Sequence, residues 1–264
     1  MDQIKVFNDL HQGDDLLMLG NAWDVLSAIL MEKAGFKAIG TTSWGVANTF
    51  GLSDGERLEF TKHLNVIKSI VVHVSIPVSA DIEAGYGEEP AAIVENVLRT
   101  ADVGVAGINL EDSLKSQKGL RDMVEHGKIL SMIRKALDSR GYHDFYVNAR
   151  VDTYFQREDP LSETLERARV YIESGASGIF VPGVADEYDI KEMASNISVP
   201  LNVLSLPGLT DGRTLKEWGV KRLSFGNAFS DQVIAMMEKT ALEVLQTGNT
   251  KRLYEGEHYA SEPV

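Results

Sequence analysis

Eight short apolar runs alternate along this chain with longer segments of helical period, and this alternation constrains the fold more than any other feature. Segments such as AWDVLSAILMEKAG and LSETLERARVYIESG carry acidic, Ser or Asp residues early and a Gly at their end. Short β-type runs separated by such helical segments predict βαβ units and a parallel sheet. The runs are LLMLG (16–20), KAIGTT (37–42), PVSADI (77–82), AGINLE (106–111), FYVNAR (145–150), GIFVPG (178–183), PLNVLS (200–205) and KRLSFG (221–226).

Eight strand and helix pairs in 264 residues are typical of a closed (β/α)8 TIM-type barrel, which needs about 250 residues. An open doubly wound sheet would place GxGxxG after its first strand, and LGNAWD lacks that motif. No linker rich in Pro, Gly or Ser divides the chain. We therefore predict one α/β barrel domain over residues 1–264, with 247–264 as a C-terminal tail or an arm that reaches a neighbouring subunit.

Charge and composition exclude several classes of function. The net charge of -13 is spread along the chain without clusters of Lys and Arg, so nucleic acid and anionic membranes are poor partners. No apolar run approaches the ~20 residues that span a bilayer, and MDQIKVFNDLHQGDD lacks the pattern of a secretory signal. The absence of cysteine excludes disulfides, thiolate metal sites and cysteine nucleophiles, and it favours a cytoplasmic protein.

Carboxylates gather at the ends of the third and fourth runs. Asp81 and Glu83 in VSADIEAGYG are two residues apart, so an extended backbone points both to the same face. Glu111 and Asp112 end the next run. Such a cluster on one barrel rim is costly unless a cation neutralises it; the alternative is that these acids cap the next helix or are solvated. Oxygen ligands alone favour Mg²⁺, or Mn²⁺, over Zn²⁺.

We expect Asp81 to be the direct metal ligand, because Mg²⁺ keeps several waters that the other carboxylates can hold. A further acid, Asp54, lies in the loop FGLSDGE after the second run. Its alternative role is the N-cap of a helix that begins near Glu56.

Other segments offer groups that could bind an anionic small molecule. Arg150 closes VNAR, and a guanidinium grips a carboxylate or phosphonate with two hydrogen bonds; the alternative is a salt bridge with the acid cluster. In TTSWGVA, Ser43, Trp44 and Gly45 offer a hydroxyl and backbone amides that could cradle an oxyanion. Ordinary turn chemistry is the alternative for this loop.

Two further pairs of residues have open roles. Asn148 and Asn202 lie within strand runs, where they either face the barrel mouth or bond to backbone inside the barrel. Lys115 and Lys118 follow the fourth run and either close over a substrate or are solvated. None of the histidines is favoured as a catalytic base, and GxSxG, P-loop and HExxH motifs are absent.

Together the runs TTSWGVA, GLSDGE, VSADIEAGYG, GINLEDS and VNARVD resemble the phosphoenolpyruvate mutase and isocitrate lyase superfamily, from about Asn21 to Phe229. The resemblance implies a (β/α)8 barrel whose C-terminal helix is exchanged between subunits, and hence a homodimer or homotetramer. It also implies that Asp81 is the direct Mg²⁺ ligand. The acids that hold metal-bound waters would be Asp54, Glu83 and Glu111.

The same resemblance implies the substrate contacts and the chemistry. Ser43 and Gly45, with Trp44 beside them, match the oxyanion-binding loop, and Arg150 matches the arginine that binds a substrate carboxylate. Members of the superfamily stabilise an enolate derived from a 2-oxo acid while a bond to its neighbouring carbon breaks or forms.

The loop after the fourth strand departs from the patterns of the superfamily. Lyases of the isocitrate type carry Lys-Lys-Cys-Gly-His there, and phosphonopyruvate chemistry accompanies a Lys-Asn-Ser loop, whereas this chain has LEDSLKSQKGLRDM. We predict a Mg²⁺-dependent carbon-carbon lyase for a small 2-oxo or related carboxylic acid, with Asp54, Arg150 and Lys115 as catalytic residues and Asn202 among the substrate contacts. Carbon-phosphorus chemistry and a non-catalytic ligand-binding homologue are the alternatives.

Overall fold

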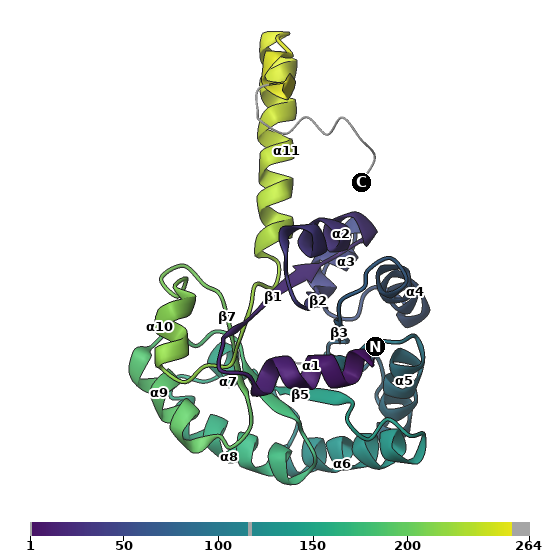
Figure 1. Cartoon of the computed structure of the whole chain (residues 1–264), viewed down its shortest axis with the longest axis vertical. Coiled ribbons are helices and arrows are strands. Elements are labelled where there is room, and N and C mark those ends of the chain that lie inside the picture. The colour runs from purple at the N-terminus through teal and green to yellow at the C-terminus, as the bar shows by residue number, and fades with distance from the viewer. Residues whose placement is uncertain (1, 116–117, 255–264) are drawn as a thin grey trace.

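The computed structural model describes residues 2–115 and 118–254, and its strands form a closed parallel barrel (Figure 1). Strands pair in chain order, and β8 closes the barrel by pairing with β1. Each predicted run corresponds to one strand, although β1 extends two residues beyond its run, so the predicted TIM-type barrel is confirmed. The strands are β1 (Leu17–Ala22), β2 (Ile39–Thr41), β3 (Val78–Asp81), β4 (Gly107–Glu111), β5 (Tyr146–Arg150), β6 (Gly178–Val181), β7 (Leu201–Leu204) and β8 (Arg222–Ser224).

Helices alternate with the strands and surround the barrel (Figure 1). Their apolar faces pack on the outward side chains of the strands and form the main core. No helix in the described ranges is long and apolar enough to cross a membrane. The helices are α1 (Gln3–Gln12), α2 (Val25–Ala34), α3 (Ser43–Thr49), α4 (Phe60–Val71), α5 (Pro90–Asp102), α6 (Met123–Ser139), α7 (Thr153–Gln156), α8 (Leu161–Glu173), α9 (Glu187–Asn196), α10 (Gly212–Glu217), α11 (Ala228–Thr247) and the 3-10 helix η1 (Lys251–Tyr254).

One predicted helix boundary is wrong. The helix expected to begin near Glu56 begins at Phe60, and the Glu59 side chain caps it by accepting a hydrogen bond from the Thr61 amide at 2.9 Å. Asp54 lies in the loop before this helix and is not its N-cap. Its carboxylate is therefore available for another role.

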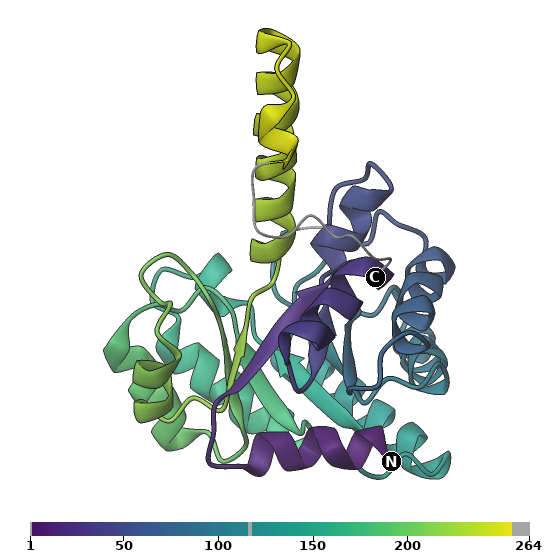
Figure 2. The ribbon, with the colours of Figure 1, turned by 45° about the horizontal axis from the view of Figure 1, so that its top comes forward.

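Helix α1 lies across the end of the barrel where the strands begin (Figure 2). The Phe7 ring packs on the edge of the Tyr146 ring at 5.4 Å, and the His11 ring stacks on Tyr146 at 4.1 Å between centroids. This helix closes the amino end of the barrel. The carboxyl ends of the strands form an open mouth on the opposite side.

Helix α11 projects away from the barrel (Figures 1 and 2). It ends at Thr247, where Gly248 adopts a left-handed conformation with φ of 65° that ends helices. Residues 255–264 of the predicted tail lie outside the described residues. Ser230 is buried, while apolar side chains along the same helix are exposed: Val233, Ile234, Met236, Met237, Leu242 and Leu245.

Candidate active site at the barrel mouth

A cavity of about 170 Å³ opens at the carboxyl ends of the strands, which is where barrels of this type carry their active sites. The sequence-predicted residues that line it come from four different strand ends or following loops. They are Ser43, Trp44, Asp54, Asp81 and Arg150, and Asn21, Asn109 and Ser224 are among the other polar residues of its wall.

Asp81 ends β3 and is fixed at the cavity wall by hydrogen bonds. Its Oδ2 accepts from the Ser43 hydroxyl at 2.9 Å and from the Ser43 amide at 3.3 Å. Its own amide donates to Thr41 Oγ1 at 2.9 Å. These bonds set the carboxylate in one orientation, and it forms no ion pair within the described residues.

Asp54 lies on the same wall, in the loop before α4. Its Oδ1 is buried and has no hydrogen-bond partner within the described part of the chain. Burial raises the pKa of Asp54, and the charges of Glu83 and Asp81 raise it further, while a hydrogen bond with Ser43 opposes the shift. A buried carboxylate oxygen without a partner is the point where a cation or a donor would be stabilised most.

Glu83 and Glu111 are neutralised by side chains of the protein. Lys115 Nζ lies 2.9 Å from Glu83 Oε2 and 2.6 Å from Glu111 Oε1, and Arg150 Nη1 lies 2.9 Å from Glu111 Oε2. Burial disfavours the Lys115 ammonium, but the charges of Glu111 and Glu83 outweigh this effect and raise its pKa. Lys115 therefore stays protonated at neutral pH, and it is a countercharge rather than a base.

The geometry separates the predicted metal ligands. Asp81 lines the cavity with Asp54, whereas Glu83 and Glu111 are each only 2% exposed and lie against Lys115. Among the described residues, no group of three or more His, Asp and Glu side chains is arranged to hold a metal ion. Two carboxylates completed by waters are nevertheless a donor set that Mg²⁺ uses, and the unpartnered Asp54 Oδ1 leaves an acceptor for it. Asp54 and Asp81 therefore fit Mg²⁺.

Arg150 stands between this cavity and a second, more open one of about 870 Å³. Its Nε and Nη2 donate to the two oxygens of Asp152 at 2.6 and 3.2 Å, and Nη1 pairs with Glu111. The salt bridge considered as the alternative role is thus present. A guanidinium has five N–H donors, so these three bonds leave two for a ligand.

The second cavity is lined by the start of the loop that follows β4. Its wall includes Lys115, Lys118, Phe155 and Arg157. Residues 116–117 of the predicted loop lie outside the described residues.

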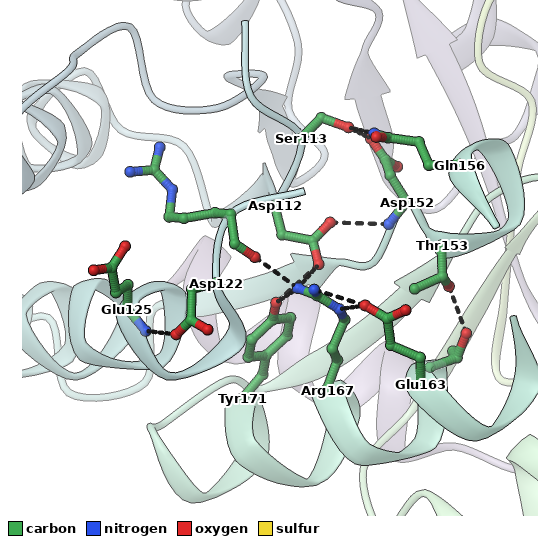
Figure 3. A network of polar contacts seen from close by, with 12 residues as sticks. Asp112, Ser113, Asp122, Glu125, Asp152, Thr153, Gln156, Glu163, Arg167 and Tyr171 are labelled. Carbon is green, nitrogen blue, oxygen red and sulfur yellow. Dashed lines mark hydrogen bonds and ion pairs between the residues drawn. The ribbon is translucent and has the colours of Figure 1, made fainter. Parts of the chain in front are cut away.

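Asp112 belongs to a separate network behind the mouth (Figure 3). Its Oδ1 accepts from the Asp152 amide at 3.0 Å, and its Oδ2 accepts from Arg167 Nη1 at 3.1 Å and from the Tyr171 hydroxyl at 2.8 Å. Arg167 also pairs with Glu163 at 2.7 Å. Asp112 is fully buried, so it supports Asp152, and through it Arg150, instead of lining the rim.

Besides Glu83, Glu111 and Lys115, three other sequence-predicted residues do not line the cavity of about 170 Å³. The Gly45 amide donates to Thr42 Oγ1 at 3.3 Å, and a Cβ atom at Gly45 would lie 2.8 Å from Trp23 Cβ, so close packing requires this glycine. Asn202 is 1% exposed and donates to the Arg222 carbonyl at 3.1 Å. Asn148 donates to Asn202 Oδ1 at 3.2 Å. Both asparagines bond inside the barrel.

The site also contains a tyrosine and a histidine that the sequence analysis did not single out. The Tyr86 hydroxyl donates to Glu83 Oε1 at 2.9 Å, and His63 Nδ1 lies 2.5 Å from that hydroxyl. Glu56, Glu83 and Tyr86 have positive φ values of 59°, 51° and 54°. Such strain in residues other than glycine gathers at functional sites. The GYG turn in the sequence was a signal for Tyr86, while His63 had none because it follows the ordinary apolar period of its helix.

The closed barrel and the acidic, arginine-flanked cavity define an α/β barrel with a candidate site at the carboxyl ends of its strands. The family model described as phosphoenolpyruvate phosphomutase matches residues 7–245. The chain belongs to the phosphoenolpyruvate mutase and isocitrate lyase superfamily, which contains lyases and mutases.

Relatives carry both kinds of activity in their names. An uncharacterized protein of Mycobacterium tuberculosis H37Rv is 40% identical over 223 residues, which cover 84% of this chain and 81% of the relative. The 2,3-dimethylmalate lyase of Eubacterium barkeri is 30% identical over 207 residues, which cover 75% and 69%. The solved structure of a phosphonomutase candidate from Burkholderia cenocepacia J2315 is 34% identical with a TM-score of 0.88, and the match covers 91% of this chain and 99% of that one.

Proposed function

We propose that this protein is a Mg²⁺-dependent carbon-carbon lyase, which cleaves a small 2-oxo or related carboxylic acid through an enolate. The observation that carries the proposal is the grouping of Asp54, Asp81 and Arg150 on the wall of one cavity. Two carboxylates that form no ion pair among the described residues suit a divalent cation, and the arginine beside them suits a carboxylate. A chelating 2-oxo acid satisfies both at once.

Each residue then has a defined task. Arg150, held by Asp152 and Glu111, presents its two remaining N–H donors to a substrate carboxylate. Asp81, held by Ser43, is the direct ligand for Mg²⁺, and Asp54 Oδ1 is the buried acceptor next to it. When bound, Mg²⁺ supplies Lewis-acid stabilisation of the negative charge that develops on the substrate.

Lys115 completes the site as a fixed positive charge. Its ion pairs with Glu83 and Glu111 prevent two buried glutamates from repelling the substrate. Glu83 and Glu111 accordingly act through Lys115 and Arg150, and the cavity itself presents only the carboxylates that hold the metal. This division lets one small cavity bind a cation and an anion together.

Carbon-phosphorus chemistry is the second candidate, and the 34% identity to the phosphonomutase candidate favours it. The 30% identity to 2,3-dimethylmalate lyase favours carbon-carbon cleavage. Incubation with Mg²⁺ and a panel of 2-oxo acids, substituted malates and phosphonopyruvate, read by proton and phosphorus NMR, separates the two. We expect 2-oxo acid products from a carbon-carbon substrate. Exchange of phosphorus resonances alone would support the mutase, and oxalate binding without any turnover would support a non-catalytic homologue.

We also propose that α11 packs on a second copy of the chain, in a homodimer or homotetramer. Its exposed apolar side chains include Met237 at 72% and Leu245 at 83% exposure, and a patch of this kind marks an interaction surface. Trp44, on the cavity wall, donates to Asp231 at the base of α11 at 3.2 Å, which couples the helix to the site. Light scattering should give a multiple of 29.0 kDa for the wild type and a smaller species for Met237→Glu.

A further inference from the structure

Arg222 is a buried arginine that forms no ion pair with a carboxylate in the described part of the chain, although the charge of Asp81 acts on it. It lies on β8 inside the barrel, its side chain is 1% exposed, and its Nη1 has no hydrogen-bond partner among the residues that the structure describes. Burial lowers its pKa to about 10, so the guanidinium remains charged at neutral pH. Burial of an unpaired charge is costly, and a chain that keeps one must gain from it elsewhere.

Two glycines inside the barrel make room for Tyr146, which interacts electrostatically with Arg222. Glycines occupy strand positions where barrels of this type carry bulky branched residues. A Cβ atom at Gly107 would lie 2.5 Å from the Tyr146 carbonyl oxygen, and one at Gly178 would overlap the Tyr146 hydroxyl. From the closed end of the barrel, His11 is kept neutral because burial, aided by the charge of Arg222, lowers its pKa to about 3. The space beneath the mouth is therefore polar, and the positive charge of Arg222 within it also acts on Asp81 at the cavity wall.

Arg222 touches the floor of the catalytic cavity through two residues. Its Nη2 donates to Asn109 Oδ1 at 3.1 Å, and its Nε donates to Ser224 Oγ at 3.3 Å. Asn109 and Ser224 both line the cavity. The guanidinium is thus one side chain below the space where a ligand would bind.

The bond to Asn109 also fixes which way that amide faces. A guanidinium can only donate hydrogen bonds, so Asn109 must turn its oxygen toward Arg222. Asn148 Nδ2 donates to the same oxygen at 2.9 Å. Both bonds hold Asn109 Oδ1 inside the barrel, and its Nδ2 is left to donate into the cavity that Asn109 lines.

We propose that Arg222 is a positioning residue that makes the cavity floor selective for dianions. It acts by turning the Asn109 amide donor toward the ligand and by supplying below it a positive charge that forms no ion pair within the described residues. The ligand class that follows is a small dicarboxylate, such as a 2-oxo dicarboxylic acid, in preference to a monoanion of the same shape. This inference rests on the proposed function for the location of the ligand.

Arg222→Met is a suitable variant because both hydrogen-bond acceptors of Arg222 keep another donor after the substitution. Asn109 Oδ1 keeps its bond from Asn148, and Ser224 Oγ keeps its bond from Asn202 Nδ2 at 3.0 Å. Methionine fills much of the volume of the arginine stem and removes the charge. Arg222→Lys is the matched control, since it keeps the charge on a shorter head group.

Calorimetry on the full chain provides a readout that a merely structural role would not give. With Mg²⁺ at saturation, we expect Arg222→Met to weaken oxalate binding by about tenfold, as the loss of one charge near a dianion implies. Binding of oxamate, a monoanion of similar shape, should weaken less. Binding of Mg²⁺ alone should stay equal or become tighter, because a repelling cation has gone. Arg222→Lys should retain most of the oxalate affinity.

The outcomes distinguish this inference from the proposed function. Equal oxalate affinity in the wild type and Arg222→Met, or an equal loss for oxalate, oxamate and Mg²⁺, overturns the inference, as does a wild type that binds no oxalate. Oxalate binding that depends on Arg222, together with no turnover of any 2-oxo acid or malate, overturns the proposed function and leaves the inference standing. Turnover with the same KM in the wild type and in Arg222→Met overturns the inference and leaves the proposed function standing.

Discussion

Two arginines are buried in this barrel to almost the same degree, and their surroundings are opposite. Arg167, 4% exposed, pairs with Asp112 and Glu163 in the network behind β4 and β5 (Figure 3). Arg222, 1% exposed, has only neutral partners and leaves Nη1 without any in the described chain. Arg167 is neutralised by its carboxylate partners, whereas Arg222 forms no ion pair among the described residues and lies charged beneath the cavity.

The difference separates structural charge from functional charge. Around Arg167, Asp112 accepts three hydrogen bonds, so the cluster is satisfied and holds two strand ends to α8. Asp54 Oδ1 at the mouth and Arg222 Nη1 beneath it have no partner among the described residues. Charged groups left unsatisfied in a cleft are the groups that a ligand or metal completes.

The largest effect on stability is expected from Arg167→Met. The substitution leaves the buried Asp112 carboxylate without its cation, and breaking a buried pair in this way costs about 3–5 kcal/mol. Arg222→Met is the control, and its free energy of unfolding should stay within about 1 kcal/mol of the wild type. Urea denaturation measures both. An equal loss in the two variants would erase the distinction between the two arginines.

Each arginine has a buried neutral histidine beside it, which predicts sensitivity to acid. Burial, with smaller effects from the neighbouring arginines, lowers the pKa of His11 and of His126 from 6.5 to about 3. Only the unfolded chain takes up these protons as pH falls from 6.5 toward 3, so stability is complete above 6.5 and declines below it. The slope is about 1.4 kcal/mol per pH unit for each histidine.

Single replacements test where this sensitivity resides. His126→Phe should make the decline in unfolding free energy between pH 7 and pH 5 shallower by up to about 1.4 kcal/mol per pH unit, while His11 and His63, whose pKa values burial also lowers, still titrate. His11→Phe should do the same beside Arg222. Urea midpoints measured at a series of pH values provide the data, and parallel slopes for the wild type and both variants would contradict the assignment.

A smaller effect is expected from Tyr171→Phe. It removes one of three hydrogen bonds to Asp112 and leaves those from Arg167 and the Asp152 amide. A single hydrogen bond contributes about 1 kcal/mol, so the melting temperature should fall slightly while ligand affinity is unchanged. A loss as large as that of Arg167→Met would mean that the tyrosine, and not the arginine, neutralises Asp112.

The alternation of strands and helices was enough to predict the barrel, because eight β-type runs separated by helices close in one way. The same pattern placed Asp81 and Arg150 at strand ends, and both line the cavity. The period of two in a strand fixes the face on which a side chain lies. A polar residue at the carboxyl end of a strand is therefore expected at the barrel mouth. These residues were predictable because their positions depend on local geometry.

Partners that meet across the barrel were not predictable in the same way. Arg222 meets Asn109 across 113 residues of sequence, and this contact depends on the register of non-adjacent strands. Lys115, only four residues after Glu111, neutralises Glu83 as well, because the loop turns back over the rim. Asp152 follows Arg150 closely in the sequence, but its role in holding Arg150 depends on the contacts with Asp112 and Arg167, which the sequence does not reveal.

The central claim is that the carboxylates at the mouth hold a metal, while the carboxylates behind it are structural. Isothermal titration calorimetry of Mg²⁺ binding to the wild type, Asp81→Ala and Tyr171→Phe tests this most directly. We predict that Asp81→Ala weakens Mg²⁺ binding by about 100-fold or more with an unchanged melting temperature, and that Tyr171→Phe leaves Mg²⁺ binding as it is. Equal Mg²⁺ affinity in Asp81→Ala and the wild type would contradict the account.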